Sequence, residues 1–349
     1  MSETFEEISA GDGHELVVLC ADTEAGYRSV IALHSTALGP AIGGARLWRY
    51  DSTDAALTDA LRLSRGMTYK CALAGLPFGG GKAVILDGGG ATQDRVQLFR
   101  AHGRFVERLG GRYITAEDVG TSPADMEHVL METEHVGGLI DRSGDPSPAT
   151  ARGVFRAVQA SARHRWGADD LKGRTVALQG CGHVGYHLAR ELAEAGASLV
   201  VADVSAERAG RVGTEFGARV VEPREIFDVE ADVFAPCALG GVVNDETLPR
   251  LRVQVVAGAA NNQLLEARHG DELAARGILY APDYVCNSGG VINGCRELLG
   301  WEPERSRQKI EEIYDTLLAI FRRAEGEGVS TARSADRLAE RRLAQAGTE

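Results

Sequence analysis

Two lysines lie close to glycine-rich stretches in the first third of the chain. Lys70 lies between residues 39–46, which read GPAIGGAR, and residues 79–82, which read GGGK and end on Lys82. Glycine leaves backbone N–H groups accessible, so a carboxylate can bind to them with a lysine cation beside it. A buried lysine, or one beside another cation, has a lowered pKa and can act as a base near neutral pH. The pattern therefore favours a site for a small carboxylate with a basic lysine.

Simpler interpretations of the same residues are open. A single lysine is more often a solvated surface residue than a catalytic one. The GGGK stretch lacks the G-x-x-x-x-G-K-[ST] pattern of a phosphate loop, because Ala83 follows Lys82. Asp118, in the stretch ITAEDVGTSPADM, ends a strand-like run. A carboxylate there can shuttle protons, but it can equally cap the helix that follows.

A glycine-rich turn in the second half of the chain has the pattern of a dinucleotide site. It lies between the strand-like run TVALQ and the helix-like run VGYHLARELAEAG, and it consists of Gly180, Cys181, Gly182, His183, Val184 and Gly185. The first glycine permits a tight turn, the second lets the backbone approach a pyrophosphate, and the third permits close helix–strand packing. The helix N-terminus favours the bound anion.

An acidic residue at the expected distance supports this interpretation. Asp203 ends the next strand-like run, 18 residues after Gly185. A carboxylate there accepts hydrogen bonds from the adenosine ribose and repels a 2′-phosphate. Val204 and Ser205 offer no arginine for NADP, although Arg208 is near. The turn, the helix and the acid together predict NAD as the cofactor and argue against a glycine turn without a ligand.

The elements that must position these residues predict two α/β domains, since 349 residues exceed the usual size of one domain. In the first half a helix is expected after a cap at Asp51 or Ser52, and a second over residues 93–109. The side of that second helix that faces the core should consist of Val96, Phe99, Gly103, Val106 and Leu109. Strands are expected at 15–20, 28–34, 83–87 and 113–116.

The second half alternates strand-like runs with helix-sized intervals, which predicts a Rossmann-type parallel sheet with helices on both faces. The runs are 175–179, 198–202, 232–235, 253–257 and 278–281. Glycine and two prolines in RSGDPSP (142–148) mark the boundary. We therefore expect a substrate-binding domain over 1–142, a dinucleotide-binding domain over 143–324, and a cleft between them. The chain from about 306 to 346 is expected to be helical, and its last part, 325–349, to pack back on the first domain or form a subunit contact.

Composition excludes several classes of protein. The net charge of −12 argues against a nucleic-acid-binding protein, which would need a basic face. Apolar runs are too short to span a membrane, and the acidic N-terminus is unlike a secretory signal, so we expect a cytoplasmic protein. The six cysteines have no metal-ligand spacing, and no metal is expected.

The chain resembles the glutamate/leucine/phenylalanine/valine dehydrogenase family from about residue 15 to the C-terminus, and its leucine and valine branch most. The resemblance is specific because several signatures occur in order across both predicted domains. They are GPAIGGARLWRY (39–50), RLSRGMTYKCALAGLPFGGGKAVI (62–85), GRYITAEDVGT (111–121), DVFAPCALGGVVNDET (232–247), VVAGAANNQL (255–264) and ILYAPDYVCNSGGVIN (278–293).

The resemblance implies a role for each candidate residue. Lys82 would activate water, and Asp118 would assist proton transfers. Lys70, with the backbone of Gly43 and Gly44, would hold the α-carboxylate of an L-amino acid. Positions near the nicotinamide, its ribose or the substrate carboxylate would be Thr150, Asn261, Asn262 and Asn287. The implied reaction is reversible oxidative deamination to a 2-oxo acid and ammonia with NAD, in a homo-oligomer.

The implied side-chain pocket consists of Ile42, Ala116, Val291 and Gly294. Glutamate-specific relatives carry a lysine at the position of Ile42, and burying a carboxylate against isoleucine is costly, so glutamate is disfavoured. Ala116 and Val291 favour a branched aliphatic substrate. Gly294, where relatives usually have valine, enlarges the pocket and leaves phenylalanine or tryptophan as an alternative. An NAD-binding sensor without catalysis is a further alternative, but Lys70, Lys82 and Asp118 are all present.

Overall fold

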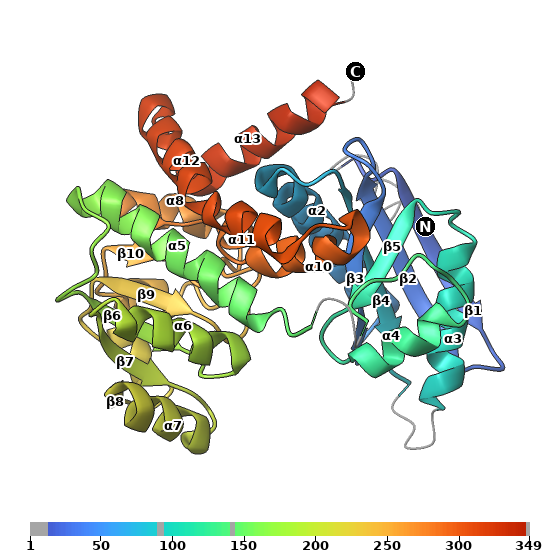
Figure 1. Cartoon of the computed structure of the whole chain (residues 1–349), viewed down its shortest axis with the longest axis horizontal. Coiled ribbons are helices and arrows are strands. Elements are labelled where there is room, and N and C mark those ends of the chain that lie inside the picture. Colours follow the sequence, from blue (N-terminus) through green and yellow to red (C-terminus); the bar gives the residue numbers. More distant parts are fainter. Residues whose placement is uncertain (1–12, 89–93, 140–143, 347–349) are drawn as a thin grey trace. The chain divides into compact units, whose positions relative to one another are not determined.

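The computed structural model describes residues 13–88, 94–139 and 144–346, and Figure 1 traces them. They divide into two units. The first comprises residues 13–88, 94–139 and 144 with 294–301 and 339–346, and the second comprises residues 145–293 with 302–338. The expected boundary between 142 and 143 lies outside the described residues, so the assignment of 1–142 and 143–324 to functional domains stays a prediction. No helix of the described residues is long and apolar enough to cross a membrane.

The first unit is built on a five-stranded sheet in the order β1-β2-β4-β3-β5. β3 runs parallel to β4 and β5, whereas β2 runs antiparallel to β1 and β4. The strands are β1 (Leu16–Asp22), β2 (Tyr27–Ser35), β3 (Ala41–Trp48), β4 (Gly79–Leu86) and β5 (Tyr113–Glu117). The four strands expected in this half are therefore present, with shifted ends.

Strand β3 is the strand of this unit that the sequence does not predict. Its glycines resemble a loop, yet β3 lies between β4 and β5. A Cβ atom at Gly43 would lie 1.8 Å from the carbonyl oxygen of Gly81 on β4. The glycines are therefore needed because the two strands approach closely here, as glycine in a strand often indicates. The β3–β4 register pairs Ile42 with Gly80 and resumes at Ala45 with Ala83.

Helices cover both faces of this sheet. On one face α2 (Thr53–Ala74) packs on a cluster that includes Val30, Ala56 and Val84. Its N-cap is Ser52, whose side chain accepts a hydrogen bond from the N–H of Ala55, so the expected start is confirmed. The other face carries a larger core beneath α3 (Arg95–Glu107) and α4 (Pro123–Leu130).

The inward face expected for α3 is largely confirmed. Phe99, Gly103 and Val106 are buried, and Leu109 packs against the same core just after the helix. Val96 is 39% exposed, so its inward placement was wrong. The reason is that α3 starts at Arg95 after an Asp94 cap, which leaves Val96 in the first turn. Residue 93 of the expected helix lies outside the described residues.

The second unit is built on a six-stranded sheet in the order β11-β10-β9-β6-β7-β8, and all of its strand pairs are parallel. The expected parallel sheet is thus confirmed, and β8 (Arg219–Val220) is an addition to it. The other strands are β6 (Thr175–Gln179), β7 (Ser198–Ala202), β9 (Val233–Pro236), β10 (Val255–Val256) and β11 (Leu279–Tyr280). The direction in which successive strands are added to the sheet reverses between β6 and β9. Doubly wound sheets bind ligands at the carboxyl ends of the strands at such a point.

The helices of this part of the chain lie between and after these strands. They are α5 (Ser147–Trp166), α6 (His183–Glu194), α7 (Ala206–Phe216), α8 (Arg268–Ala275), α9 (Asp283–Cys286) and α10 (Gly289–Leu299). The expected helical tail consists of α11 (Pro303–Glu311), α12 (Ile313–Glu327) and α13 (Thr331–Ala346). The end of α13 belongs to the first unit: Arg342 donates hydrogen bonds to the carbonyl oxygens of Ala72 and Leu73, at the end of α2.

Candidate functional site

One face of the first sheet gathers the predicted catalytic residues. Side chains alternate between faces along a strand. Ala83 and Ile85 belong to the core beneath α3 and α4, so Lys82 and Val84 face α2. By the same alternation, five further residues lie on the α2 face: three from β3, one from β5 and one from the loop after β5. They are Ile42, Gly44, Arg46, Ala116 and Asp118.

Lys82 and Asp118 form a direct ion pair on this face. The Nζ atom of Lys82 lies 3.0 Å from Oδ1 of Asp118, and their side chains are only 5% and 19% exposed. Lys82 is therefore a buried lysine, which removes the surface interpretation. The loop after β5 fixes the aspartate backbone, because its N–H donates to Oγ1 of Thr121 at 2.8 Å.

Burial and neighbouring charges set the protonation of this pair. Burial lowers the pKa of Lys82, and the Arg46 cation lowers it further, while the Asp118 carboxylate opposes both. Burial alone would raise the pKa of Asp118, but the charges of Lys82 and Arg46 outweigh it and lower that pKa to about 2. Asp118 thus stays ionised at neutral pH, and Lys82 is the member of the pair that titrates in the alkaline direction.

Asp118 does not cap the following helix. The N-cap of α4 is Ser122, which forms a reciprocal capping box with Asp125. The carboxylate of Asp118 instead accepts hydrogen bonds from side chains of the sheet. The capping alternative that the sequence leaves open is therefore removed.

The predicted carboxylate-binding residues lie on β3 and α2. Gly43 and Gly44 are in β3, and a Cβ at Gly44 would lie 2.3 Å from the carbonyl oxygen of Glu117. Neither position tolerates a side chain, because each contacts the backbone of a neighbouring segment. The Tyr113 hydroxyl donates to the carbonyl oxygen of Gly43 at 2.6 Å, which holds this part of β3. Lys70 lies on α2 and is half-buried.

Sequence reasoning missed three polar residues around Asp118. Arg46 donates from Nε to Oδ2 of Asp118 at 2.9 Å and from Nη1 to Oδ2 of Asp59 at 2.9 Å. The Tyr50 hydroxyl donates to the same oxygen of Asp59 at 2.5 Å. A signal was present, since Arg46 follows Gly44 by two residues on β3 and so shares its face.

The glycine turn of the second unit has the geometry that each glycine role requires. Gly180 has a φ of +95°, which a residue with a side chain rarely adopts. A Cβ at Gly185 would lie 1.9 Å from the carbonyl oxygen of Gly180, so the helix packs closely on the turn. A Cβ at Gly182 would meet nothing within 4 Å, and no side chain caps α6 there. A pyrophosphate fits at this open helix N-terminus.

Asp203 is tied to the same turn. Its Oδ2 accepts a hydrogen bond from the N–H of Cys181 at 2.7 Å, and its Oδ1 accepts one from the N–H of Ser205 at 2.7 Å. The carboxylate thus bridges the ends of β6 and β7. The turn residues His183 and Val184 open α6, and Cys181 is buried.

Asn287 presents an unpartnered acceptor near the carboxyl end of β10. Its Nδ2 donates to Oδ1 of Asn261 at 2.8 Å and to the carbonyl oxygen of Ala259 at 3.0 Å. Its Oδ1 is buried and has no hydrogen-bond partner among the described residues. A carboxamide N–H is the kind of donor that this oxygen requires. Thr150 lies on α5 and packs against the segment that follows Asn287. A Cβ atom at Gly290 in that segment would lie 2.6 Å from Oγ1 of Thr150.

The remaining predicted residues are dispersed over the two units. Asn262 belongs to the second unit and is the one non-glycine residue with positive φ (52°) among the described residues. Val291 and Gly294 lie three positions apart on α10 and so share a helix face, although Val291 belongs to the second unit and Gly294 to the first. Ile42 is 6% exposed in the first unit.

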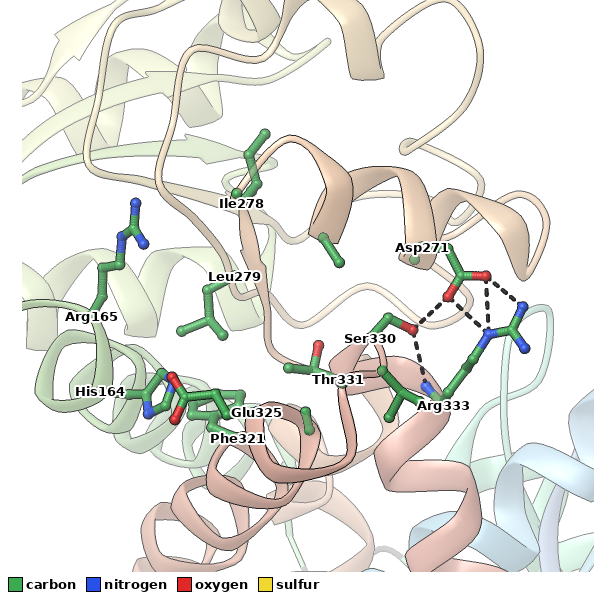
Figure 2. Close-up of a pocket in the computed structure, with 16 residues that line it drawn as sticks. His164, Arg165, Asp271, Ile278, Leu279, Phe321, Glu325, Ser330, Thr331 and Arg333 are labelled. Atoms are coloured by element: carbon green, nitrogen blue, oxygen red, sulfur yellow. Dashed lines mark hydrogen bonds and ion pairs between the residues drawn. The ribbon is translucent and has the colours of Figure 1, made fainter.

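A cavity of about 910 Å³ in the second unit is lined by none of the predicted site residues. Figure 2 shows the side chains that line it. Two ion pairs line it, Asp271 with Arg333 and Glu325 with His164, and Arg165 donates a hydrogen bond to Gln254. Elsewhere in this unit Asp245, His269 and Glu272 gather their ligand atoms within 4.8 Å of one another. Arg268 pairs with both of these carboxylates, so their charge is already satisfied by a cation.

Comparisons with known proteins match nearly the whole chain. The family model "Glu/Leu/Phe/Val dehydrogenase, dimerisation domain" matches residues 14–135. The model "Glutamate/Leucine/Phenylalanine/Valine dehydrogenase" matches residues 137–207 and 201–349.

Three relatives with different named substrates are similar over at least nine tenths of their lengths. A leucine dehydrogenase of Geobacillus stearothermophilus is 52% identical over 345 residues, which are 98% of this chain and 93% of the relative. A phenylalanine dehydrogenase of Bacillus thermotolerans is 45% identical over 98% of this chain and 91% of the relative's length. The crystal structure of L-tryptophan dehydrogenase from Nostoc punctiforme superposes with a TM-score of 0.87 at 46% identity, covering 99% of this chain and 100% of that one.

Proposed function

The chain belongs to the glutamate/leucine/phenylalanine/valine dehydrogenase family, and on that premise we propose that it oxidatively deaminates a branched-chain L-amino acid with NAD⁺. The amino acid, NAD⁺ and water give the 2-oxo acid, ammonium, NADH and a proton. The observation that carries the proposal is the buried Lys82–Asp118 pair, 3.0 Å apart, on the sheet face that also bears Gly44.

Lys82 acts as the general base in the proposed mechanism. Its lowered pKa makes the neutral amine easier to form than in an exposed lysine, and this amine takes a proton from water. The resulting hydroxide adds to the Cα of the iminium, and the carbinolamine collapses to the 2-oxo acid and ammonia. The ionised carboxylate of Asp118 accepts a hydrogen bond from Lys82 and holds the amine in place. Lys70, with the backbone of Gly43 and Gly44, holds the substrate α-carboxylate.

NAD⁺, when bound, accepts the hydride from the substrate Cα. Its pyrophosphate would lie on the turn from Gly180 to Gly185, where Gly182 leaves open space at the start of α6. Asp203 would accept hydrogen bonds from the adenosine ribose. Asn287 would accept one from the carboxamide, with Thr150 and Asn261 beside it. These residues hold and orient the cofactor and carry out no step themselves.

The substrate side chain would contact Ile42, Ala116, Val291 and Gly294, and Ile42 offers no cation for the second carboxylate of glutamate. A buried carboxylate without a partner is costly, which supports an apolar substrate. The leucine dehydrogenase relatives favour a branched aliphatic side chain. One observation favours the aromatic alternative: a Cβ at Gly294 would meet nothing within 4 Å, so the site has room there.

The dimerisation-domain model supports a homo-oligomer, and we expect the enzyme to act in the cytoplasm. A non-catalytic NAD sensor is a weaker alternative. A sensor has no need for a buried lysine whose pKa is lowered beside an ionised aspartate.

The test is NADH formation from NAD⁺ with a panel of L-amino acids at mildly alkaline pH. The panel contains leucine, valine, isoleucine, phenylalanine, tryptophan and glutamate. Highest kcat/KM on leucine, valine or isoleucine is the expected result. Highest kcat/KM on phenylalanine or tryptophan would replace the substrate assignment and keep the reaction. No turnover with any of them, while NAD⁺ binds, would overturn the proposal.

A further inference from the structure

Arg46 connects the candidate catalytic pair to a second carboxylate. Its guanidinium donates to Asp118 through Nε and to Asp59 through Nη1, each at 2.9 Å. The three side chains are between 19% and 23% exposed, so solvent screens these contacts only in part. Asp118 is therefore held from two sides, by Lys82 on Oδ1 and by Arg46 on Oδ2.

Asp59 and Tyr50 fix Arg46 in turn. Asp59 lies on α2, and its Oδ2 accepts both the Arg46 and the Tyr50 hydrogen bond. Arg46 and Tyr50 come from β3 and the segment after it, so the contact joins the strand to the helix that covers it. A guanidinium is suited to this position because its planar fork donates to two carboxylates at once, which a lysine cannot do in the same geometry.

We propose that Arg46 is a positioning residue that holds Asp118 turned toward Lys82, and that Asp59 and Tyr50 form the support that holds Arg46. This inference rests on the proposed function, because Lys82 is the general base there. It adds that the alignment of the base depends on a chain of side chains that reaches α2. Arg46 and Asp59 act through Asp118 and Lys82, without touching the substrate.

The charged groups in this series of side chains have opposite effects on the pKa of Lys82. The charged groups that act on it are Asp118 after β5, Arg46 on β3 and Asp59 on the covering helix α2. The Arg46 cation disfavours a charged lysine and so lowers its pKa, whereas Asp59 raises it. Removing Arg46 should therefore make Lys82 harder to deprotonate, and removing the charge of Asp59 should make it easier.

The test compares the pH profile of kcat/KM for deamination in the native enzyme, Arg46→Gln and Asp59→Asn. Activity on the acid side rises as Lys82 loses its proton, so the acid limb reports its pKa. We expect this limb to move to higher pH in Arg46→Gln and to lower pH in Asp59→Asn, by about one unit each. Arg46→Lys should restore the position of the limb, because the charge is kept, while kcat stays at least about tenfold low because the second contact is lost.

Arg104→Gln is the matched control. It removes the pair that Arg104 on α3 forms with Asp22 of β1, on the side of the sheet opposite α2. This variant should keep the native profile. Limbs that do not move, or that move in the same direction in Arg46→Gln and Asp59→Asn, would overturn the charge relation. A native kcat in Arg46→Lys would overturn the positioning role.

A second measurement is independent of turnover. The pH dependence of acetylation of Lys82 by trace acetic anhydride, read by mass spectrometry on the folded proteins, gives the lysine pKa directly. If the native protein shows no dehydrogenase activity but the labelling curves shift in opposite directions, the proposed function fails and the charge relation stands. If turnover is present and neither profile shifts, the charge relation fails alone.

Discussion

Replacing Gly294 by valine should narrow substrate choice without harming the fold. Gly294 lies inside α10, and a Cβ there would meet nothing within 4 Å. Valine has a better helix propensity than glycine, so the substitution should stabilise the helix by about 0.5 kcal/mol. In the proposed site the added side chain takes up space that a large aromatic substrate would need.

The magnitude follows from the cost of overfilling an apolar pocket, about 1–3 kcal/mol. The kcat/KM for phenylalanine relative to leucine should therefore fall about 5- to 150-fold, since 1.4 kcal/mol is a factor of ten. The assay is the initial rate of NADH formation with each amino acid, together with a thermal unfolding curve to verify that the fold is intact.

Gly326→Val is the control for the helix effect. Gly326 also lies in a helix, α12 of the second unit, and a Cβ there would likewise meet nothing within 4 Å. This variant should leave the phenylalanine-to-leucine ratio unchanged. An unchanged ratio in Gly294→Val as well, with both proteins folded, would refute the placement of Gly294 against the substrate side chain.

Three further predictions test other parts of the molecule. Gly43→Ala should destabilise the fold by several kcal/mol in chemical denaturation, because its Cβ would lie 1.8 Å from a β4 carbonyl oxygen. Gly182→Ala should melt like the native protein, because its Cβ meets no protein atom, yet raise the Kd for NAD⁺ about tenfold by calorimetric titration. Burial lowers the pKa of His102 from 6.5 to about 3. The unfolded chain then binds one more proton between these values, so the free energy of unfolding should fall by about 4 kcal/mol as pH drops from 6.5 to 3. His102→Phe should flatten that dependence in urea melts at pH 7 and 4.5; an equally steep fall would show that other groups cause it.

The sequence predicted the second unit better than the first. Its strands are apolar runs separated by helix-length intervals, and a parallel sheet buries both faces of such runs. The run TVALQ and the turn after it were located to the residue. Strand β3 of the first unit is hard to recognise in the sequence, because Ala41–Trp48 contains two glycines that look like a loop until the close approach of β4 is known.

The parts of the candidate site that a single sequence motif identifies were predictable. The contacts between side chains from different elements were not. Lys82 was identifiable from its motif, and the structure adds that it is buried against Asp118. The link from Arg46 to Asp59 depends on β3 being a strand covered by α2, so it could not be recognised while residues 39–46 were taken for a loop. Long-range side-chain pairs of this kind follow from tertiary packing and leave no local pattern.

The most direct test of the central claim is the stoichiometry of turnover by the native enzyme and by Lys82→Ala. Leucine and NAD⁺ at mildly alkaline pH should give equal amounts of NADH, ammonium and 2-oxo acid with the native enzyme. The Lys82→Ala protein should bind NAD⁺ as tightly but lose at least about 10²-fold in kcat, since a general base is removed. Native-like kcat in that folded variant, or NADH formed without ammonium, would contradict the account.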